Sequence, residues 1–525
     1  MHSTDSPQHL SSLTELLDRG AERFGDSPFA IDAATGRELS FEALKEASAC
    51  VASALHQRFS IAPGSHVAML LPNCVEILPI YFGILRAGCV FVPINARLKS
   101  EEFQFIAGDC DAQAVFVHPA TWKPAQEALK AMQWSKPVIA VGFDKAPENT
   151  IPFTDLLVGR DAVPVPPPSK TDGTGVSPCS REDVAAIIYT SGTTGRPKGA
   201  MLTHGNILFN VESTLAGHEF RAADVHLLIV PLFHVTGLNT IMPTALFQGS
   251  PMVVSASIDP EEVVDTIERY KCSTFVGVPT TFYLLANLRD LKREKLQSVR
   301  LICYSGAPMS PLTIQRLREM FPRVELHNFY GLTETTSVTT VLPDSQALSR
   351  AESVGLPPPG LQLAIMDDSD QPLPAGELGE LCVKGPSVLK GYYKRPDATA
   401  EAIRDGWFHT GDTAFIDTDG YVFLRGRKKE LIIVAGENVY PIEVENVLCA
   451  HPSVQEAAVF GRPDPALGEV VHAVAVLRPG QTITEGELRA FVNVRLAAFK
   501  QPRTIIFMEK LPRNPSGKVM KRELK

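Results

Sequence analysis

The sequence has few features of a membrane protein, a secreted protein or a disulfide-bonded one. Its most apolar stretches, such as Val67–Leu71, are much shorter than the roughly 20 residues of a membrane-spanning helix. Met1–Leu10 is polar and lacks the hydrophobic centre of a signal peptide. The nine cysteines are scattered without a C-x-x-C pair, so they indicate neither a disulfide framework nor a zinc site. Arg522–Lys525 matches no peroxisomal tripeptide. We therefore expect no membrane span and a cytoplasmic location.

Basic blocks are also absent, and the formal net charge is −9, which argues against a nucleic-acid partner. With 44% hydrophobic and 21% charged residues, the composition is that of an ordinary globular protein. A chain of 525 residues exceeds what one hydrophobic core supports, so we expect two or more domains. No internal repeat indicates a solenoid. The pattern leaves open whether the protein is a monomer or a homodimer.

Short apolar runs alternate with helical periodicity along most of the chain. The predicted strands His66–Leu71 and Cys89–Pro93 flank a predicted helix, Cys74–Arg86, which is the pattern of a parallel strand–helix–strand unit. From Gly355 to Leu424 the helices become rare and short strands dominate. After Gly426 strands and helices alternate again, in a compact α+β unit of about 100 residues. The pattern predicts an α/β protein with a β-rich part and a small C-terminal α+β domain.

The most distinctive stretch is a loop of Gly, Ser and Thr that follows an apolar β-branched run and ends at a lysine. Glycines let the backbone approach a ligand closely, and consecutive N–H groups can form an anion-binding concavity. The hydroxyls add donors and the lysine adds a positive charge. The Gly-Lys-[Ser/Thr] ending of a Walker A loop is missing. A linker is the alternative, but it would need neither the strand nor the lysine. We interpret this stretch as a nucleotide-phosphate loop formed by Thr190, Ser191, Gly192, Thr193, Thr194, Gly195 and Lys198.

A second polar stretch follows the predicted strand Val324–Phe329, at the end where parallel sheets bind ligands. Tyr330 offers a flat face for a purine, and Asn328 offers a donor and an acceptor for a base edge. Glu334 can hold a hard cation that bridges phosphates, with magnesium favoured. A helix N-cap explains Thr333 equally well.

Other stretches could contact a nucleotide, and each has a simpler reading. Small residues at the end of a predicted strand, Gly306, Ala307 and Pro308, would let a base or ribose approach, although a tight turn would look the same. An ionised Asp412 could accept both hydroxyls of a ribose, and Arg427 could reach the same sugar or lie in a solvated basic turn. Gly436 could let a ligand chain pass, or simply precede a helix that begins at Pro441.

Taken together and in this order, these stretches resemble the adenylate-forming superfamily, which includes acyl-CoA synthetases, 4-coumarate–CoA ligases, firefly luciferase and the adenylation domains of peptide synthetases. The matching motifs are TSGTTGRPKG, YGLTET, WFHTGD, GRKKELI, GENVYPIEVE and NPSGK. The resemblance implies a large N-terminal domain, residues 1–426, of two αβ-layered subdomains plus a β-rich subdomain. A hinge at 427–429, with Lys429 as the pivot, would connect it to a small α+β C-terminal lid domain, residues 430–525.

The resemblance also implies a reaction in two steps. A carboxylate attacks the α-phosphate of ATP to give an acyl-adenylate and pyrophosphate, and the sulfur of coenzyme A then attacks the acyl-adenylate. Lys518, which alone would be read as a solvent-facing lysine, would bridge the carboxylate and the α-phosphate. Thr333 would touch the α-phosphate and Glu334 would hold Mg²⁺. The lid would then rotate about Lys429, and Gly436 would line a tunnel for the pantetheine arm.

By the same resemblance, an acyl pocket is formed by Phe233, His234, Thr236, Gly237 and Phe329, with His234 also among the catalytic residues. Amino-acid-activating members have an aspartate at the position of His234, so an α-amino acid substrate is disfavoured. Coumarate ligases have an aromatic hydroxyl residue at the position of Thr236 and a glycine at that of Phe329. The bulk of Phe329 predicts a short pocket, for a small or medium-chain or aromatic acid.

Three functions follow from this. The leading one is an acid–CoA ligase, because the Asn514–Lys518 turn and the Glu437–Glu443 stretch look like that branch. Its partners would be a small-molecule carboxylic acid, ATP, Mg²⁺ and coenzyme A. The second is an adenylating enzyme that loads a separate carrier protein. The third, a nucleotide-binding protein without catalysis, is disfavoured because Glu334, Asp412, Arg427 and Lys518 are all present.

Overall fold

The computed structural model describes residues 6–157, 179–190, 197–286, 288, 291–306, 309, 311–321, 323–435, 437–465, 467–514 and 519–524. The chain divides into two compact units. The first contains Met1–Gln362 and Val383–Phe408, and the second contains Leu363–Cys382 and His409–Lys525. The boundary after residue 426 and the hinge at 427–429 stay predictions. In the second unit, Arg427 ends strand β21 (Val422–Arg427) and Lys429 lies in a short 3₁₀ turn, η8 (Lys428–Glu430).

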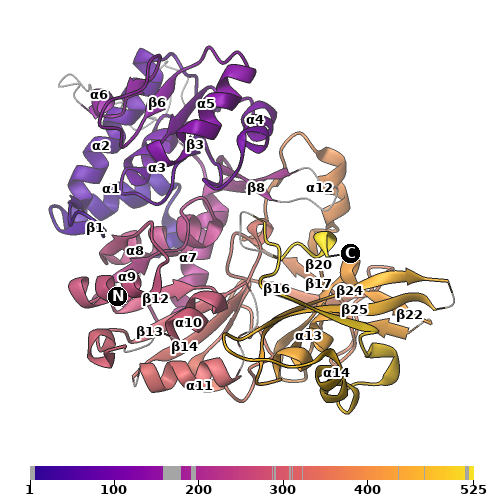
Figure 1. Ribbon diagram of the computed structural model, residues 1–525. Helices are drawn as coiled ribbons and strands as arrows, with labels where there is room; N and C mark the ends of the chain where they lie inside the picture. Colours follow the sequence, from indigo (N-terminus) through magenta and orange to yellow (C-terminus); the bar gives the residue numbers. More distant parts are fainter. Residues whose placement is uncertain are drawn as a thin grey trace. The chain divides into compact units, whose positions relative to one another are not determined.

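One sheet of the first unit has eight strands in the order β18-β9-β8-β4-β3-β5-β6-β7. The strands from β8 to β7 run parallel, while β9 and β18 are antiparallel to their neighbours. Helices α3, α4 and α5 connect the central strands, as Figure 1 shows. The elements are β3 (His66–Leu70), α3 (Ile77–Arg86), β4 (Val90–Pro93), α4 (Ser100–Asp109), β5 (Ala114–Val117), α5 (Trp122–Ala131), β6 (Val138–Ala140), β7 (Ile151–Pro152), α6 (Thr154–Leu157), β8 (Val184–Thr190), β9 (Lys198–Thr203) and β18 (Gly391–Tyr392).

The second sheet of this unit also has eight strands, in the order β15-β14-β13-β12-β10-β11-β1-β2. Its strands are β1 (Pro28–Asp32), β2 (Glu38–Ser40), β10 (His226–Leu228), β11 (Met252–Val254), β12 (Thr274–Gly277), β13 (Leu301–Ser305), β14 (Glu325–Tyr330) and β15 (Thr340–Leu342). The helices of this part are α1 (Leu13–Phe24), α2 (Phe41–Ser53), α7 (His204–His218), α8 (Met242–Gln248), α9 (Pro260–Tyr270), α10 (Pro279–Ala286) and α11 (Pro311–Met320). The strands from β14 to β1 run parallel, so their carboxyl ends share one edge.

The main core of the first unit lies between these layers. It contains aromatic side chains without solvent exposure, among them Phe29, Phe41 and Tyr81. Burying each such side chain contributes about 1.5–3 kcal/mol before entropy is counted. Helices α2 and α3 pack so closely that a Cβ on Gly83 would lie 2.5 Å from Val51. The core therefore fixes the strand ends from which the polar motifs emerge.

The remaining strands form two sheets of five. One contains β16 (Gln362–Met366), β17 (Gly379–Lys384), β19 (Ile403–Arg404), β20 (Trp407–Ile416) and β21, with α12 (Pro396–Ala402) preceding β19. The other contains β22 (Ile432–Val434), β23 (Glu437–Val439), β24 (Val454–Asp464), β25 (Gly468–Leu477) and β26 (Thr504–Met508). Helices α13 (Pro441–Cys449) and α14 (Glu485–Asn493) pack with the second of these sheets.

The predicted fold class is confirmed, with local differences in the bounds. The predicted helix Cys74–Arg86 begins only at Ile77, because the preceding Asn73 side chain hydrogen-bonds to the backbone of residues 230, 232 and 255 and holds that turn in place. The helix expected to begin at Pro441 does so. Within the part of the chain that the structure describes, no helix is long and apolar enough to cross a bilayer.

Candidate active site

Thr190, Glu334 and Tyr392 form a polar cluster in the first unit. The hydroxyl of Thr190 donates to Oε1 of Glu334 at 3.3 Å, and the hydroxyl of Tyr392 donates to the same oxygen at 3.0 Å. Thr190 ends β8 and pairs with Lys198 at the start of β9, so both ends of the predicted phosphate loop lie beside this carboxylate. Two stretches predicted separately, the phosphate loop and the Glu334 segment, therefore meet in the fold.

The backbone around Glu334 is a tight turn that only certain residues allow. Glu334 lies in a 3₁₀ turn, η6 (Thr333–Thr335), which directly follows β14. A Cβ on Gly331 would overlap the carbonyl oxygen of Ser337, so glycine is required there. Thr336 and Ser337 have φ values of 57° and 99°, which non-glycine residues seldom adopt. Backbone strain of this kind is typical of functional sites.

Lys198 carries a charge that no carboxylate neutralises among the described residues. Its ammonium lies 5.2 Å from the centroid of the Tyr392 ring. A cation held over an aromatic face keeps its charge available for an anionic ligand. Residues between the two strands that were predicted to contact phosphates lie outside the described residues: Ser191, Gly192, Thr193, Thr194 and Gly195.

The residues predicted to contact the base lie at the carboxyl ends of β13 and β14. Asn328 is only 4% exposed, and its side-chain amide donates to the carbonyl oxygen of Ser353 at 3.3 Å. Tyr330 is half-buried at the end of β14. Gly306 has a φ of +87°, a left-handed conformation that favours glycine. Ala307 and Pro308 lie outside the described residues. The roles of these residues toward a base stay predictions.

In the second unit, Asp412 and Arg427, both predicted to contact a ribose, lie side by side, and their role toward a ribose stays a prediction. They lie opposite each other on the antiparallel strands β20 and β21. Nε of Arg427 is 2.7 Å from Oδ1 of Asp412, and another guanidinium nitrogen donates to the carbonyl oxygen of Thr410 at 2.8 Å. Two of the predicted residues, Gly436 and Lys518, lie outside the described part of the chain.

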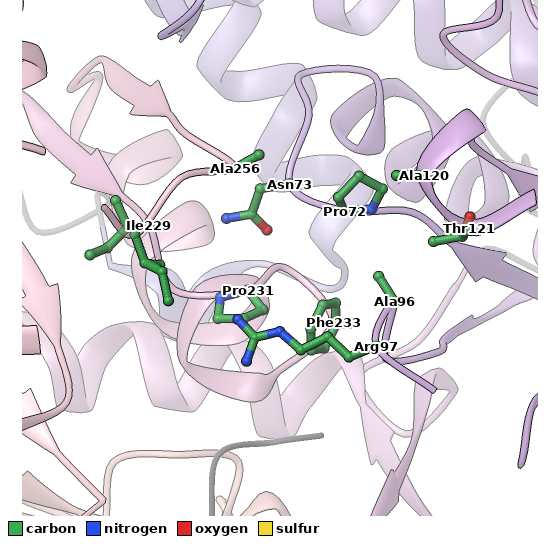
Figure 2. Close-up of a pocket in the computed structure, with 11 residues that line it drawn as sticks. Pro72, Asn73, Ala96, Arg97, Ala120, Thr121, Ile229, Pro231, Phe233 and Ala256 are labelled. Carbon is green, nitrogen blue, oxygen red and sulfur yellow. The ribbon is translucent and has the colours of Figure 1, made fainter. Parts of the chain in front are cut away.

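A cavity of about 160 Å³ opens at the carboxyl ends of parallel strands from both sheets of the first unit. Figure 2 shows residues that follow β3, β4 and β5 on one side and residues that follow β10 and β11 on the other. Its lining is mostly apolar and includes one cation: Pro72, Asn73, Ala96, Arg97, Ala120, Thr121, Ile229, Pro231, Phe233, Ala256 and Ile258. Open α/β sheets bind ligands at such positions.

Asn73 holds the two sides of this cavity together. Its amide nitrogen donates to the carbonyl oxygens of Val230 at 3.0 Å and Ser255 at 3.2 Å, while its side-chain oxygen accepts the Leu232 N–H at 2.8 Å. The loop after β3 is thereby tied to the loops after β10 and β11. These contacts use every polar atom of the Asn73 side chain, so the residue shapes the cavity rather than offering it a free group.

Of the residues predicted for an acyl pocket, only Phe233 lines this cavity. His234 follows it; burial, together with the smaller effect of the Arg97 cation, lowers the pKa of His234 to about 4. Thr236 and Gly237 begin a short π-helix, η4 (Thr236–Ile241). Phe329 is 3% exposed and packs edge-to-face against His218, with ring centroids 5.3 Å apart. The part that these residues play in binding an acid stays a prediction.

Two models of known protein families match this chain. A model of the family described as AMP-binding enzyme matches residues 17–393, and a model of the AMP-binding enzyme C-terminal domain matches residues 443–518. The chain belongs to the AMP-binding enzyme family. The adenylate-forming resemblance read from the motifs is thereby confirmed.

Similar proteins match this AMP-binding enzyme over nearly its whole length. It is 35% identical to a feruloyl-CoA synthase of an Amycolatopsis species, over 93% of this chain and 94% of that protein. It is also 35% identical to the fatty acid–[acyl-carrier-protein] ligase ScoC of Streptomyces coeruleorubidus, over 93% of this chain and 92% of that one. Its fold is similar to that of the ATP-bound MatB from Rhodopseudomonas palustris, with a TM-score of 0.85, 32% identity and 98% coverage of both chains.

The donors around Glu334 suit the magnesium ion that ATP carries. Among the described residues, no group of three His, Cys, Asp or Glu side chains could hold a metal by itself. Magnesium in phosphate sites is instead held by one or two carboxylates together with phosphate oxygens and waters. In this AMP-binding enzyme Oε1 of Glu334 accepts both hydrogen bonds, and Oε2 accepts none from the described residues. Glu334 therefore fits this role.

Sequence reasoning missed Tyr392, Asn73 and Arg97. Tyr392 lies 58 residues from Glu334 and follows a glycine in a stretch that carried no recognised chemistry. Asn73 and Arg97 each follow a parallel strand, so the rule that drew attention to Tyr330 could have found them as well. Their surroundings, however, include loops of the other sheet, which come from distant parts of the sequence.

Proposed function

We propose that this chain is an acid–CoA ligase, which activates a carboxylic acid with ATP and transfers the acyl group to coenzyme A. The observation that carries the proposal is the arrangement of Glu334, Thr190 and Lys198: a carboxylate held by hydroxyl groups, with a cation that pairs with no described carboxylate, beside the two ends of a Gly/Ser/Thr loop. Membership of the AMP-binding enzyme family and the CoA-ligase relatives support it.

In the first step, the acid's carboxylate attacks the α-phosphate of ATP, an acyl-adenylate forms and pyrophosphate leaves. Both reactants are anions, so the site must supply positive charge where they meet. Lys198 attracts the departing phosphates from the start of β9, and Lys518 neutralises the charge where the carboxylate meets the α-phosphate. Bound at Glu334, Mg²⁺ supplies charge neutralisation at the phosphate oxygens. Thr333 lies next to Glu334 and contacts the α-phosphate.

Asp412 and Arg427 take the ribose of ATP in this proposal. The Asp412 side chain is 9% exposed, and Arg427 fixes its orientation through the 2.7 Å ion pair; a carboxylate is the acceptor that the hydroxyls of a ribose require. A charged pair held in this way recognises a vicinal diol with little further rearrangement. Asn328 and Tyr330 lie two residues apart on β14, so both can face the base from one side of the strand.

In the second step, the thiol of coenzyme A attacks the acyl carbonyl and AMP leaves. A rotation about Lys429 withdraws Lys518, and Gly436 lets the pantetheine arm pass. The described cavity supports this step, because coenzyme A combines an apolar arm with phosphates, and the lining combines apolar side chains with Arg97. His234, which follows the cavity-lining Phe233 and is neutral at pH 7, can donate or accept a hydrogen bond.

The acid is small or medium-chain or aromatic, and it is not an α-amino acid. Phe329 supports the size limit, because its buried ring packs on His218 and occupies space at the end of β14. His234 supports the exclusion of amino acids, because a neutral imidazole cannot pair with an ammonium as an aspartate would. Turnover across a series of straight-chain and aromatic acids tests this, and best activity with long fatty acids would refute it.

Loading of a separate carrier protein is the second candidate, and the similarity to ScoC favours it.

A cytoplasmic location belongs to the main proposal. The nine cysteines are all free thiols, which suits a reducing compartment. The partners are then a carboxylic acid, ATP and coenzyme A.

Two assays test the proposal. Acid-dependent exchange of pyrophosphate into ATP measures adenylation, and thioester formation with free coenzyme A, compared with carrier proteins, identifies the acceptor. We expect both activities with coenzyme A. Lys518→Ala should abolish exchange and leave thioester formation from supplied acyl-adenylate, whereas Lys510→Ala, a tail control, should leave both. Exchange without thioester formation from coenzyme A would favour carrier loading, and the absence of any exchange would refute adenylation.

A further inference from the structure

Tyr392 contacts two members of the candidate site at once. Its hydroxyl donates to Oε1 of Glu334 at 3.0 Å, and the ammonium of Lys198 lies 5.2 Å from the centroid of its ring. The second distance is within the range of a cation–π interaction. One side chain therefore touches both the cation at the end of the phosphate loop and the carboxylate that suits magnesium.

The backbone holds Tyr392 firmly in this place. Its strand, β18, pairs with β9, so that Tyr392 lies opposite Ala200, two residues beyond Lys198. Its N–H donates to the hydroxyl of Thr399 at 2.9 Å. The residue before it, Gly391, has a φ of +147°, and a Cβ there would lie 2.9 Å from Thr399. Glycine at position 391 therefore lets β18 lie this close to Thr399 of α12.

The side chains of the residues that follow contact acidic residues at the end of α4. The hydroxyl of Tyr393 donates to Oδ2 of Asp111 at 3.1 Å, and Arg395 forms an ion pair with Asp109 at 2.7 Å. Both carboxylates lie at or just beyond the end of α4. Tyr392 as a residue is 8% exposed, and a buried side chain on a paired strand has little freedom to change rotamer.

We propose that Tyr392 is a positioning residue for the metal-bound nucleotide. Its hydroxyl occupies Oε1 of Glu334 and so directs Oε2 toward the metal ion, and its ring holds the charge of Lys198 at the start of β9. Thr190 supports the same carboxylate oxygen from the other strand, at 3.3 Å. The inference rests on the proposed function, because Mg²⁺ with ATP is the ligand of that proposal.

The test compares Tyr392→Phe with Tyr393→Phe in the full chain. Both changes remove one hydroxyl from neighbouring residues, but only the first hydroxyl bonds to Glu334. Calorimetric titration with a non-hydrolysable ATP analogue, at a series of Mg²⁺ concentrations, gives the half-saturating Mg²⁺ and the metal-free affinity. Tyr392→Phe should raise the half-saturating Mg²⁺ about tenfold, the usual loss when a partner of a ligating carboxylate is removed, with metal-free affinity unchanged. Tyr393→Phe should change neither.

Tyr392→Leu separates the two roles. It removes the ring as well, so it should also weaken metal-free binding of the analogue about threefold, which corresponds to one cation–π contact. An unchanged half-saturating Mg²⁺ in Tyr392→Phe, or an equal rise in Tyr393→Phe, would overturn the inference. If Tyr392→Phe does not fold, Thr399→Val removes the hydroxyl that accepts the Tyr392 N–H and leaves the Tyr392 side chain intact. It should raise the half-saturating Mg²⁺ by less than the roughly tenfold change expected of Tyr392→Phe. No rise would again overturn the inference.

The outcome is independent of the acid. If the wild type shows no acid-dependent exchange, the proposed ligase function fails, yet the Mg²⁺ dependence of nucleotide binding still decides the role of Tyr392. If exchange is present, the change in Tyr392→Phe should appear as a higher KM for MgATP with less effect on kcat. A lower kcat at saturating MgATP and Mg²⁺, with KM unchanged, would contradict the positioning role.

Discussion

Lys521 forms the centre of a partly buried charge cluster in the second unit. Its ammonium lies 2.8 Å from Glu430, which ends the η8 turn, and 2.8 Å from Glu445 on α13. The lysine side chain is only 19% exposed and the Glu445 side chain 15%. Burial by itself would lower the pKa of Lys521, but the two carboxylates more than offset this and raise its pKa. The cluster therefore ties the C-terminal tail to the segment that follows the predicted hinge.

We predict that Lys521→Met destabilises this unit by about 3 kcal/mol. Breaking a buried pair usually costs about 3–5 kcal/mol, because the partner charge remains without compensation. The lower end applies here because Glu430 is 36% exposed and water screens it. Lys500→Met is the matched control: Lys500 pairs with one carboxylate, Glu443, whose side chain is 35% exposed, so its loss should cost about 1 kcal/mol.

Hydrogen exchange of the β24 and β25 amides in the full chain measures the effect in this unit alone. Exchange through unit opening should accelerate by about 100-fold in Lys521→Met and by less than about tenfold in Lys500→Met. The folded pKa of Lys521 is raised, so its contribution is complete below the unfolded pKa and is lost only as pH rises through the folded one. The difference should thus stay constant from neutral to mildly alkaline pH. Equal effects of the two substitutions would refute the reasoning.

Three further predictions concern the first unit. Arg97→Met should raise the KM for coenzyme A about tenfold, because a cation paired with phosphate contributes about 1.5–3 kcal/mol. It should leave ATP–pyrophosphate exchange unchanged. Steady-state kinetics of both half-reactions check this. Burial lowers the pKa of His204 to about 4, so the free energy of unfolding should fall as the pH drops from about 6.5 towards 4. His204→Asn should remove up to about 3 kcal/mol of that pH-dependent fall, as measured by urea unfolding. Phe329→Ala should cost about 3–5 kcal/mol in thermal unfolding and should raise kcat/KM for longer acids relative to short ones.

The parts of the site that the sequence predicted are those formed by local chemistry at strand ends. Thr190 and Glu334 could be named because a run of small polar residues after a buried strand, or an acid after a strand, has a use on its own. Asp412 and Arg427 needed only the pairing of two consecutive strands, β20 and β21. The start of α13 at Pro441 followed from the preference of proline for the first turn of a helix.

The rest depends on tertiary pairing that no local pattern encodes. Tyr392 reaches Glu334 only because β18 adds to the edge of β9, and Asn73 reaches Val230 and Ser255 only because two sheets share a core. Ile77 rather than Cys74 begins α3 for the same reason, since the Asn73 contacts fix the turn before the helix. Helical periodicity describes which residues could be helical, but a long-range hydrogen bond decides where the helix starts.

The most direct test of the central claim is the acid-dependent exchange of labelled pyrophosphate into ATP by the purified full chain. Each acid of the series is added in turn, with Glu334→Gln as the variant and Glu377→Gln, a surface control, beside it. We expect exchange with at least one small, medium-chain or aromatic acid, an unchanged rate in the control and a loss of at least about 100-fold in Glu334→Gln. No exchange with any acid, or full exchange in Glu334→Gln, would contradict it.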